Sequence, residues 1–590
     1  MPKNILVAVA WPYANAEIHV GNITGAYLPA DIFARYHRLS GNHVLMVSGS
    51  DAHGTPITVR ADAEGKSAND VYKHYHDGFL NLFMQLGITY DLFTTTHSEN
   101  HFNVSQTVFK RLLENGYLYT ETEKQWYSPD ENRFLPDRYV EGTCYICGYE
   151  NARGDQCDGC GSILDGKRLI DPHSRTGNVS LELRDTEHFF LDLAKLAPQI
   201  SEYLANDKSH WRPNVIKPSR YTVDEIGLHG RAITRDLDWG IPVPLSEWDS
   251  KCLYVWFEAV IGYLSASIEW ALDKDHPSLW HDWWYKSEAL SYYFIGKDNI
   301  PFHAVIWPAE LAGIGSIFPQ DPESSLNMPY AIPANEFMNL EGQKISGSRN
   351  WAVWGLDVVE RYGPDPVRYY LTINMPETKD TDWSWSEFQQ RNNDQLVATW
   401  GNLVNRVLSF SYKNFDARVP EPGDLGHQDY ELLDEIKSGF DTVGDLLRAT
   451  KMRAALQEAF RLAGEVNKYL DEQEPWFTIK SDREKASRSV YTALKAIDSL
   501  KIIFSPFLPY SSEKIHKYLG YEGTLFGTQT TRMVGEGTLS YTVLEYSNST
   551  AIGKWKPSEL SQGQLLRKPS PLFQKLDEDI VSDEMERLGD

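Results

Sequence analysis

The stretch WPYANAEIHVGN, residues 11–22, joins an apolar run to the start of an expected helix. Residues 5–10 (ILVAVA) before it are continuously apolar, which is typical of a buried strand in a parallel sheet. A strand-to-helix turn of this kind points backbone N–H groups and the positive end of the helix toward anions. His19 and Gly21 at the helix start therefore indicate a phosphate-binding site. The same residues also suit a plain structural turn with a surface histidine, so the rest of the chain has to distinguish the two.

Length and composition restrict the class of protein. The chain has 590 residues, so we expect roughly three or four domains. Its net charge of −25 argues against non-specific nucleic-acid binding and against an anionic membrane partner, while a specific nucleic-acid partner would need a confined basic face. No apolar run approaches the ~18 residues of a membrane span, and no signal-peptide pattern is present. We expect a cytoplasmic protein.

Four of the five cysteines form two Cys-x-x-Cys-Gly knuckles. They are Cys144-x-x-Cys147-Gly148 and Cys157-x-x-Cys160-Gly161. Four thiolates with this spacing predict a closed tetrahedral zinc site that stabilises structure and takes no part in chemistry. A pair of redox dithiols is the alternative, and the doubled spacing disfavours it.

The apolar pattern divides the chain into six segments. We expect α/β halves in residues 1–117 and 229–330, a cysteine-bearing insertion in 118–228, a linker with a lysine loop in 331–390, a helical domain in 391–525 and a polar tail in 526–590. In the helical segment apolar residues recur every three or four positions, which predicts an antiparallel helix bundle. Part of the tail could pack back against the other domains as an arm.

Two further strand ends carry candidate ligand groups. Asp51 follows the expected strand 44–47, and Asp298 follows a strand that ends near Gly296. Ligands of open α/β sheets bind at the carboxyl ends of strands. Asp51 could therefore meet a substrate group and Asp298 a ribose hydroxyl, although Asp298 could equally cap a helix. Neither a dinucleotide fingerprint nor a phosphate loop of the Gly-Lys-Ser/Thr type occurs in the chain.

The loop of residues 339–349 (NLEGQKISGSR) contains two glycines, two serines, a lysine and an arginine. A flexible cationic loop of this kind could neutralise charge that develops on departing pyrophosphate. An exposed basic loop without function is the plainer interpretation.

Together these motifs resemble those of class I aminoacyl-tRNA synthetases. His19-Val20-Gly21-Asn22 is similar to their His-Ile-Gly-His motif, and Lys344-Ile345-Ser346-Gly347-Ser348 to their Lys-Met-Ser-Lys-Ser loop. Five more blocks resemble the methionyl-tRNA synthetase family in particular: 12–15 (PYAN), 51–57 (DAHGTPI), 254–256 (YVW), 294–298 (FIGKD) and 471–476 (DEQEPW). The resemblance covers residues 4–515. It implies an α/β Rossmann-like catalytic domain with an inserted zinc-binding module, followed by an α-helical anticodon-binding bundle.

The resemblance also implies an activity. Such enzymes activate L-methionine with ATP, which carries Mg²⁺, to methionyl-adenylate, and transfer the methionyl group to the 3′ end of initiator and elongator tRNA(Met). No appended tRNA-binding or dimerisation domain is evident, so we expect a monomer.

Residue roles follow from the same resemblance. The catalytic group would be His19, Gly21, Asn22, Lys344, Ser346 and Arg349. ATP would contact His19, Gly21, Asn22, Gly296, Asp298, Lys344 and Gly347. Methionine would contact Trp11, Tyr13, Asp51, Trp256, Ala259, Tyr263 and His303, with Arg235 orienting Asp51. The anticodon would be read by Asn402, Arg406 and Trp476. Without the resemblance, the aromatic residues would be interpreted as ordinary core.

Two positions depart from the family pattern. Asn22 replaces the second histidine of the first motif, and its amide keeps a hydrogen-bond donor. Gly347 replaces the second lysine of the loop, which removes a contact worth about 2–4 kcal/mol unless Arg349 substitutes for it.

Three alternatives stay open. They are a synthetase for another apolar amino acid, a small nucleotidylyltransferase, and a tRNA-binding paralogue with a decayed lysine loop. The short insertion disfavours the first, since such enzymes usually carry a long editing insertion. The helical segment and the length disfavour the second, and the retained motif residues disfavour the third.

Overall fold

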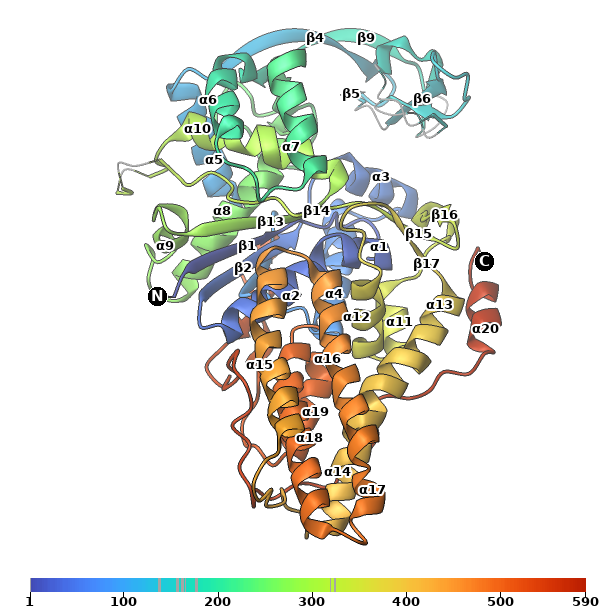
Figure 1. Ribbon diagram of the computed structural model, residues 1–590. Helices are drawn as coiled ribbons and strands as arrows, with labels where there is room; N and C mark the ends of the chain where they lie inside the picture. Colours follow the sequence, from blue (N-terminus) through green and yellow to red (C-terminus); the bar gives the residue numbers. More distant parts are fainter. Residues whose placement is uncertain are drawn as a thin grey trace.

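The computed structural model describes residues 2–589 except 136–138, 155, 156, 158, 161–163, 165, 176–178, 319, 323 and 324, and the side chain of Ser348. Gly161 of the second knuckle lies outside the described residues. Figure 1 shows three regions: the insertion at the top, an α/β domain in the middle and a helical bundle pointing downward. No described helix combines the length and apolarity needed to cross a membrane.

The α/β domain is built on a parallel sheet with the strand order β14-β13-β1-β2-β3. These strands are β1 (Asn4–Val9), β2 (His43–Ser50), β3 (Leu92–Thr95), β13 (Leu290–Gly296) and β14 (Ala334–Asn335). The helices around them are α1 (Val20–Asn22), α2 (Leu28–Leu39), α3 (Thr55–Glu64), α4 (Ala68–Leu86), α5 (Glu99–Glu114), α8 (Val255–Asp273), α9 (His281–Trp284) and α10 (Trp307–Ile314). The first strand pairs with a strand from each half of the chain, so the expected Rossmann-like domain is confirmed.

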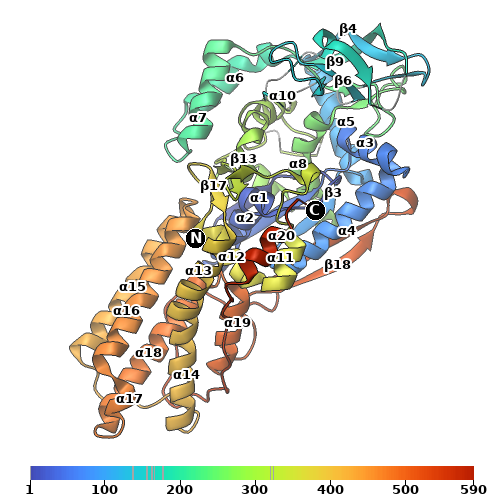
Figure 2. The same ribbon diagram turned by 90° about the vertical axis from the view of Figure 1, so that its right-hand side faces the viewer.

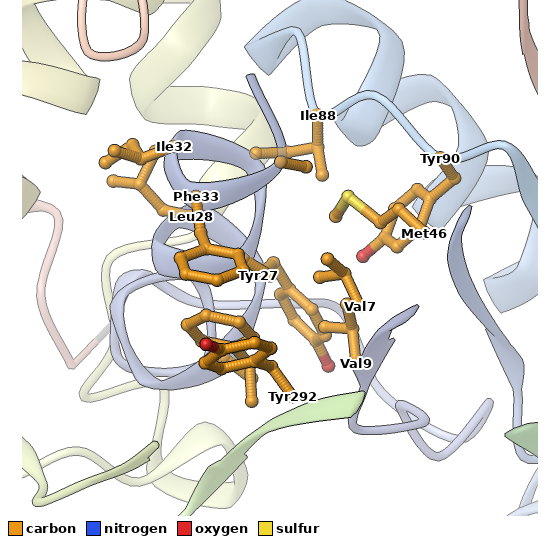
Figure 3. Packing of buried hydrophobic residues seen from close by; sticks show 14 of the residues in the cluster. Val7, Val9, Tyr27, Leu28, Ile32, Phe33, Met46, Ile88, Tyr90 and Tyr292 are labelled. Atoms are coloured by element: carbon orange, nitrogen blue, oxygen red, sulfur yellow. The ribbon is translucent and has the colours of Figure 1, made fainter. Parts of the chain in front are cut away.

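The core of this domain lies between the sheet and α2 (Figure 3). Val7 and Val9 of β1 are fully buried, and the Phe33 ring of α2 lies 4.5 Å from the Tyr292 ring of β13. The alternating faces of a parallel sheet are both covered here, which is why β1 is apolar throughout.

The insertion is an antiparallel arm that carries a small module at its tip. Its long strands β4 (Leu118–Ser128) and β9 (Glu182–Leu191) pair along their whole length. The module contains β6 (Val140–Thr143), β7 (Ala152–Arg153) and β8 (Ile170–Ser174), with a separate small core. The chain returns through α6 (Leu193–Ala205) and α7 (Pro213–Arg220).

Beyond the sheet, a linker region leads to the bundle. The linker has β15 (Met338–Leu340), β16 (Gln343–Lys344), α11 (Gly355–Tyr362), α12 (Pro364–Ile373), β17 (Thr381–Trp383) and α13 (Trp385–Arg391). The bundle has α14 (Asn402–Asn414), α15 (His427–Arg448), α16 (Met452–Gln473), α17 (Pro475–Thr478), α18 (Arg483–Phe504) and α19 (Pro509–Tyr518). The expected helical domain is confirmed.

A fully buried arginine fixes the bundle to the α/β domain. Arg368 of α12 lies 2.7 Å from the Asp31 carboxylate of α2 and donates hydrogen bonds to the carbonyl oxygens of Pro506 and Phe507. Burial alone would raise the pKa of Asp31, but Arg35 and Arg368 hold it at about 2. A buried charge needs such partners, so this network specifies how the two domains meet.

The last segment of the chain returns to the α/β domain. Strands β18 (Thr528–Val534) and β19 (Tyr541–Ser547) form a hairpin, and β19 pairs antiparallel with β3. Among the described residues the sheet therefore has seven strands, two of them from the segment expected to be a polar tail. A short final helix, α20 (Ile580–Glu586), packs on α13.

Candidate functional site

The phosphate corner lies where β1 leads into α1. His19 caps α1. Its ring Nδ1 accepts a hydrogen bond from the Asn22 backbone N–H at 3.3 Å, and the His19 backbone N–H donates to Asn22 Oδ1 at 3.2 Å. Burial lowers the pKa of His19 to about 4, so the ring is neutral at pH 7. With Nδ1 accepting, the ring proton sits on Nε2, which can donate to an oxygen of a ligand.

The departure at Asn22 has a local reason. Its amide oxygen closes the reciprocal cap with His19, which leaves the amide N–H₂ as a donor.

The lysine loop lies directly against this corner. Val20 N–H donates to Val353 O at 3.0 Å, and Gly355 N–H donates to Ile18 O at 2.8 Å. A Cβ on Gly21 would lie 3.0 Å from the His19 ring and 3.2 Å from Ile345 Cδ1, so only glycine lets both side chains approach this closely. The tertiary structure thus brings together two motifs that are more than 300 residues apart.

Asp298, predicted to bind the ribose, lies directly after β13. A Cβ on Gly296 would lie 2.7 Å from the Asp298 carboxylate, which explains the glycine. Burial raises the pKa of Asp298, and the nearby Lys297 and Lys344 oppose this rise. Lys344 itself is exposed on β16.

The departure at Gly347 also has a structural reason. A Cβ at this position would lie 3.1 Å from the Trp354 ring, so a lysine would require the indole to move. Arg349 follows on the same turn, exposed, with its Nε 3.3 Å from Ser346 Oγ. The loop therefore presents Lys344 and Arg349 as its cationic side chains.

Aromatic side chains form a pocket beside the phosphate corner. The Tyr13 ring meets the Trp256 ring edge to face at 5.8 Å, and Trp256 stacks on Phe302 at 4.2 Å. A cavity of about 80 Å³ lies here, lined among others by Tyr13, Trp256 and Arg235. Phe302, which stacks on Trp256, was not among the predicted site residues; it lies four residues after Asp298, and its local sequence gave no signal.

Tyr263 and His303, also predicted to contact methionine, do not line this cavity but are joined to each other by a hydrogen bond. Tyr263 Oη lies 2.7 Å from His303 Nε2, while His303 Nδ1 lies 2.9 Å from Asn299 O. Burial lowers the pKa of His303 to about 4, so it is neutral. Trp11 fills the space where Gly49 and Gly262 leave room for its indole. Ala259, half-buried on α8, lies one turn after Val255.

A buried carboxylate lies beneath the pocket. Asp51 is 3% exposed, its backbone bridges to Tyr13, and its Oδ1 accepts from His53 N–H at 3.4 Å. Burial and the neighbouring Glu258 raise its pKa well above the usual value. An acidic group this costly to bury is typical of a site that binds a cation.

Glu258 belongs to a buried network that the sequence reasoning did not identify. Its carboxylate oxygens lie 2.7 Å from His53 Nδ1 and 2.6 Å from His101 Nε2. Burial alone would raise the pKa of Glu258, but the two histidines hold it at about 2. His53 lies inside the DAHGTPI block, which was the available signal.

Arg235 lines the same cavity but makes other contacts. Its guanidinium lies 3.8 Å from the Tyr254 ring and donates to Thr234 O at 2.8 Å. Arg235 and Asp51, both described, form no salt bridge, so the orienting role of Arg235 stays a prediction.

The four knuckle cysteines converge in the insertion. Their Sγ atoms all lie within 4.8 Å of one another, with Cys147 and Cys157 3.6 Å apart. A tetrahedron with Zn–S bonds of about 2.3 Å has sulfur–sulfur edges of about 3.8 Å. Gly148 has φ +78, and its N–H donates to Cys144 O at 2.9 Å, which forms the turn of the first knuckle. The cluster can hold one metal ion.

The predicted base-reading residues lie on two helices of the bundle. The Arg406 guanidinium of α14 lies 4.8 Å from the Trp476 ring of α17, and that ring meets Phe410 edge to face at 5.0 Å. Asn402 is exposed about one turn before Arg406 on the same helix. Figure 1 shows α17 at the far end of the bundle from the sheet.

A Rossmann-like sheet on which two signature loops meet at one phosphate corner, followed by a helical bundle, is the architecture of a class I aminoacyl-tRNA synthetase. The sequence comparisons agree: residues 5–408 match the family described as "tRNA synthetases class I (M)" and residues 419–538 match "Anticodon binding domain of methionyl tRNA ligase". The chain belongs to this methionyl-tRNA synthetase family.

Relatives resemble the chain over its full length. The methionine–tRNA ligase of Thermomicrobium roseum is 53% identical over 100% of this chain and 99% of its own, and that of Roseiflexus sp. is 54% identical with the same coverage. The structure of Mycobacterium tuberculosis methionyl-tRNA synthetase in complex with methionyl-adenylate has a TM-score of 0.76 at 25% identity, over 97% of this chain and 99% of that one.

Proposed function

We propose that this chain is a methionine–tRNA ligase that forms methionyl-adenylate from L-methionine and ATP and transfers the methionyl group to tRNA(Met). The observation that carries the proposal is the meeting of the His19 corner, the Lys344 loop and the Asp51 pocket at one end of the sheet. ATP enters as its Mg²⁺ complex. We also propose that the enzyme works in the cytoplasm, where it would supply translation.

In the first step an oxygen of the methionine carboxylate attacks the α-phosphorus of ATP, and pyrophosphate leaves. The protein contributes by positioning and by charge stabilisation, since no covalent help is needed. His19 Nε2–H would donate to a phosphate oxygen, and Lys344 and Arg349 would neutralise the charge on the departing pyrophosphate. Asp298 would accept from a ribose hydroxyl.

The methionine side chain would lie among Tyr13, Trp256, Tyr263 and His303. A thioether is polarisable and packs well on aromatic faces, and the neutral His303 adds no charge to the pocket. Asp51 would pair with the substrate ammonium. In the second step the 2′-hydroxyl of the terminal adenosine attacks the carbonyl carbon, and AMP leaves.

Recognition of tRNA would fall to the bundle. Trp476 can stack an unpaired base, while Asn402 and Arg406 can bond base edges. The wide separation of α17 from the sheet suits an L-shaped tRNA that contacts both ends of the protein.

Pyrophosphate–ATP exchange across the twenty amino acids, followed by charging of tRNA with a CAU anticodon, tests the proposal. We expect exchange with methionine alone and charging of that tRNA. Exchange with another apolar amino acid, or with none, would overturn it. Gel filtration of the purified chain tests the expected monomer.

We propose that the metal of the cysteine cluster is zinc. Cys157→Ser should lower bound zinc from about one ion per chain to almost none, because a structural site needs all four thiolates. The matched control is Cys252→Ser, which alters a buried thiol outside the cluster and should leave the zinc content unchanged. Elemental analysis of the purified proteins measures both, and zinc retained in full by Cys157→Ser would contradict the assignment.

Arg349→Ala should slow adenylate formation by about 10²-fold if Arg349 replaces the missing second lysine of the loop. Binding of methionine should not change, since Arg349 is on the phosphate side. Rapid-quench measurement of adenylate gives the rate, and Arg349→Lys should retain most of it. Adenylate formation at the wild-type rate in Arg349→Ala would show that the loop works with Lys344 alone.

A further inference from the structure

The final segment of the chain connects the helical bundle to the lysine loop. Figure 2 shows α20 beside α11 and α13, at the end of an irregular loop that leaves the bundle. Leu576 is fixed to α13 and to the helical segment Asn392–Gly401 that follows it: its N–H donates to Asn393 Oδ1 at 2.8 Å, and its carbonyl accepts from Gln389 at 3.0 Å. We call residues 576–589 the C-terminal strap.

A buried carboxylate anchors the strap. Glu584 of α20 is 2% exposed although the helix is at the surface. It receives hydrogen bonds or ion pairs from Arg361 Nε at 2.8 Å, from Tyr362 Oη at 2.7 Å and from Arg587 at 3.4 Å. A buried acid with three donors is strongly held, because removing it leaves those donors without their partner.

The far end of the strap contacts Asn350, the residue that directly follows the lysine loop. Gly589 N–H donates to Asn350 O at 3.2 Å. Asn350 has φ +49 and ends the turn 347–349 in the left-handed conformation that asparagine adopts more readily than most residues. Its Oδ1 accepts from Trp354 Nε1 at 3.1 Å.

Trp354 leads from this contact to the catalytic corner. Its backbone bridges to His19, and the two rings lie 6.3 Å apart. The same indole occupies the space beside Gly347. A continuous set of contacts therefore runs from Glu584 through the strap and Asn350 to Trp354 and His19.

This arrangement matters because a cationic loop stabilises a transition state only when it is already in place. The loop here has glycine at position 347, which adds backbone freedom and removes a cation. A contact that holds the end of the loop would offset part of that freedom.

We propose that Glu584 is a positioning residue for adenylate formation: by anchoring the C-terminal strap on α11, it holds the lysine loop against the phosphate corner. The expected effect on adenylate formation rests on the proposed function. The expected effect on the lysine loop rests only on the contacts described above.

The test compares Glu584→Ala with Glu586→Ala, an exposed glutamate of the same helix. We expect Glu584→Ala to slow adenylate formation about tenfold in rapid-quench assays while methionine Kd stays within about twofold. Hydrogen exchange of residues 343–350 should accelerate in Glu584→Ala and not in Glu586→Ala. Glu584→Gln keeps the shape of the side chain, so its adenylate rate should lie between those of the wild-type and Glu584→Ala proteins. This variant also covers the case in which Glu584→Ala does not fold.

Arg361→Ala completes a double-mutant cycle. If Glu584 acts through this arginine, the double variant should be no slower than Glu584→Ala alone. Wild-type rate and exchange in Glu584→Ala, or a parallel loss of methionine binding, would overturn the proposal. If the wild-type protein makes no methionyl-adenylate, the proposed function fails while the exchange measurement still tests the strap.

Discussion

Lys344→Ala should slow methionyl-adenylate formation about 10²- to 10³-fold and leave the Kd for methionine unchanged. Lys344 is exposed on β16, yet lies close enough to Asp298 to oppose the rise in pKa of that carboxyl. It therefore lies on the side of the site where ATP is predicted to bind, near Asp298. Because Gly347 replaces the second lysine, the loop has fewer cations to compensate for the loss.

Rapid-quench assays at saturating methionine and ATP measure this rate, and tryptophan fluorescence measures methionine binding. Lys379→Ala is the matched control, since Lys379 is an exposed lysine of the same linker region. A loss of methionine affinity as large as the loss of rate would place Lys344 at the amino acid and contradict the assignment.

Asp51→Asn should raise the KM for methionine by about 10²- to 10³-fold, the order expected when one partner of a buried ion pair is removed. The substitution keeps the shape of the side chain and removes the charge that meets the substrate ammonium. The control is Asp77→Asn, an exposed carboxylate of α4. An unchanged KM in Asp51→Asn would show that another group binds the ammonium.

The pH dependence of binding provides an independent measurement. Burial and Glu258 raise the pKa of Asp51 in the free protein, so methionine binding should weaken as the pH falls through that pKa and the carboxylate becomes protonated. In Asp51→Asn this acid limb should disappear. A limb that persists in the variant would assign the titration to a different group.

The same substitution should raise the Tm at neutral pH. A carboxyl whose pKa is higher in the folded than in the unfolded state lowers stability as the pH rises through the folded-state pKa. Asparagine removes that cost, so the gain should vanish below about pH 4, where Asp51 is protonated in both states. Loss of function with a gain in stability distinguishes a binding residue from a structural one.

Much of the site could be predicted because its residues lie in short local patterns. The apolar run before His19, the doubled cysteine knuckles and the glycine-rich loop around Lys344 each have a physical reason within a few residues. Their order along the chain then identified the family and, with it, the three regions that the structure contains. The residue roles that follow from the resemblance stay predictions, among them those of Arg235 and Asn402.

The remaining features depend on contacts between residues far apart in the sequence. In the sequence, Glu258 looks like an ordinary polar residue of a mostly apolar helix. Only the folded structure places it between His53 and His101. The tail was expected to be polar from its composition, and β18 is indeed exposed along most of its length, yet β19 pairs with β3 and extends the sheet of the α/β domain.

The sequence by itself determined the chemistry available to this protein: a histidine–glycine corner, a lysine loop, a carboxylate after a strand and four thiolates. The tertiary structure decided how those groups are held. It set the tautomer of His19 through Asn22, filled the space beside Gly347 with Trp354, and brought Gly589 to Asn350. The reason is physical: residue type sets what a side chain can bind, whereas burial, pKa and position depend on neighbours that only the folded chain brings together.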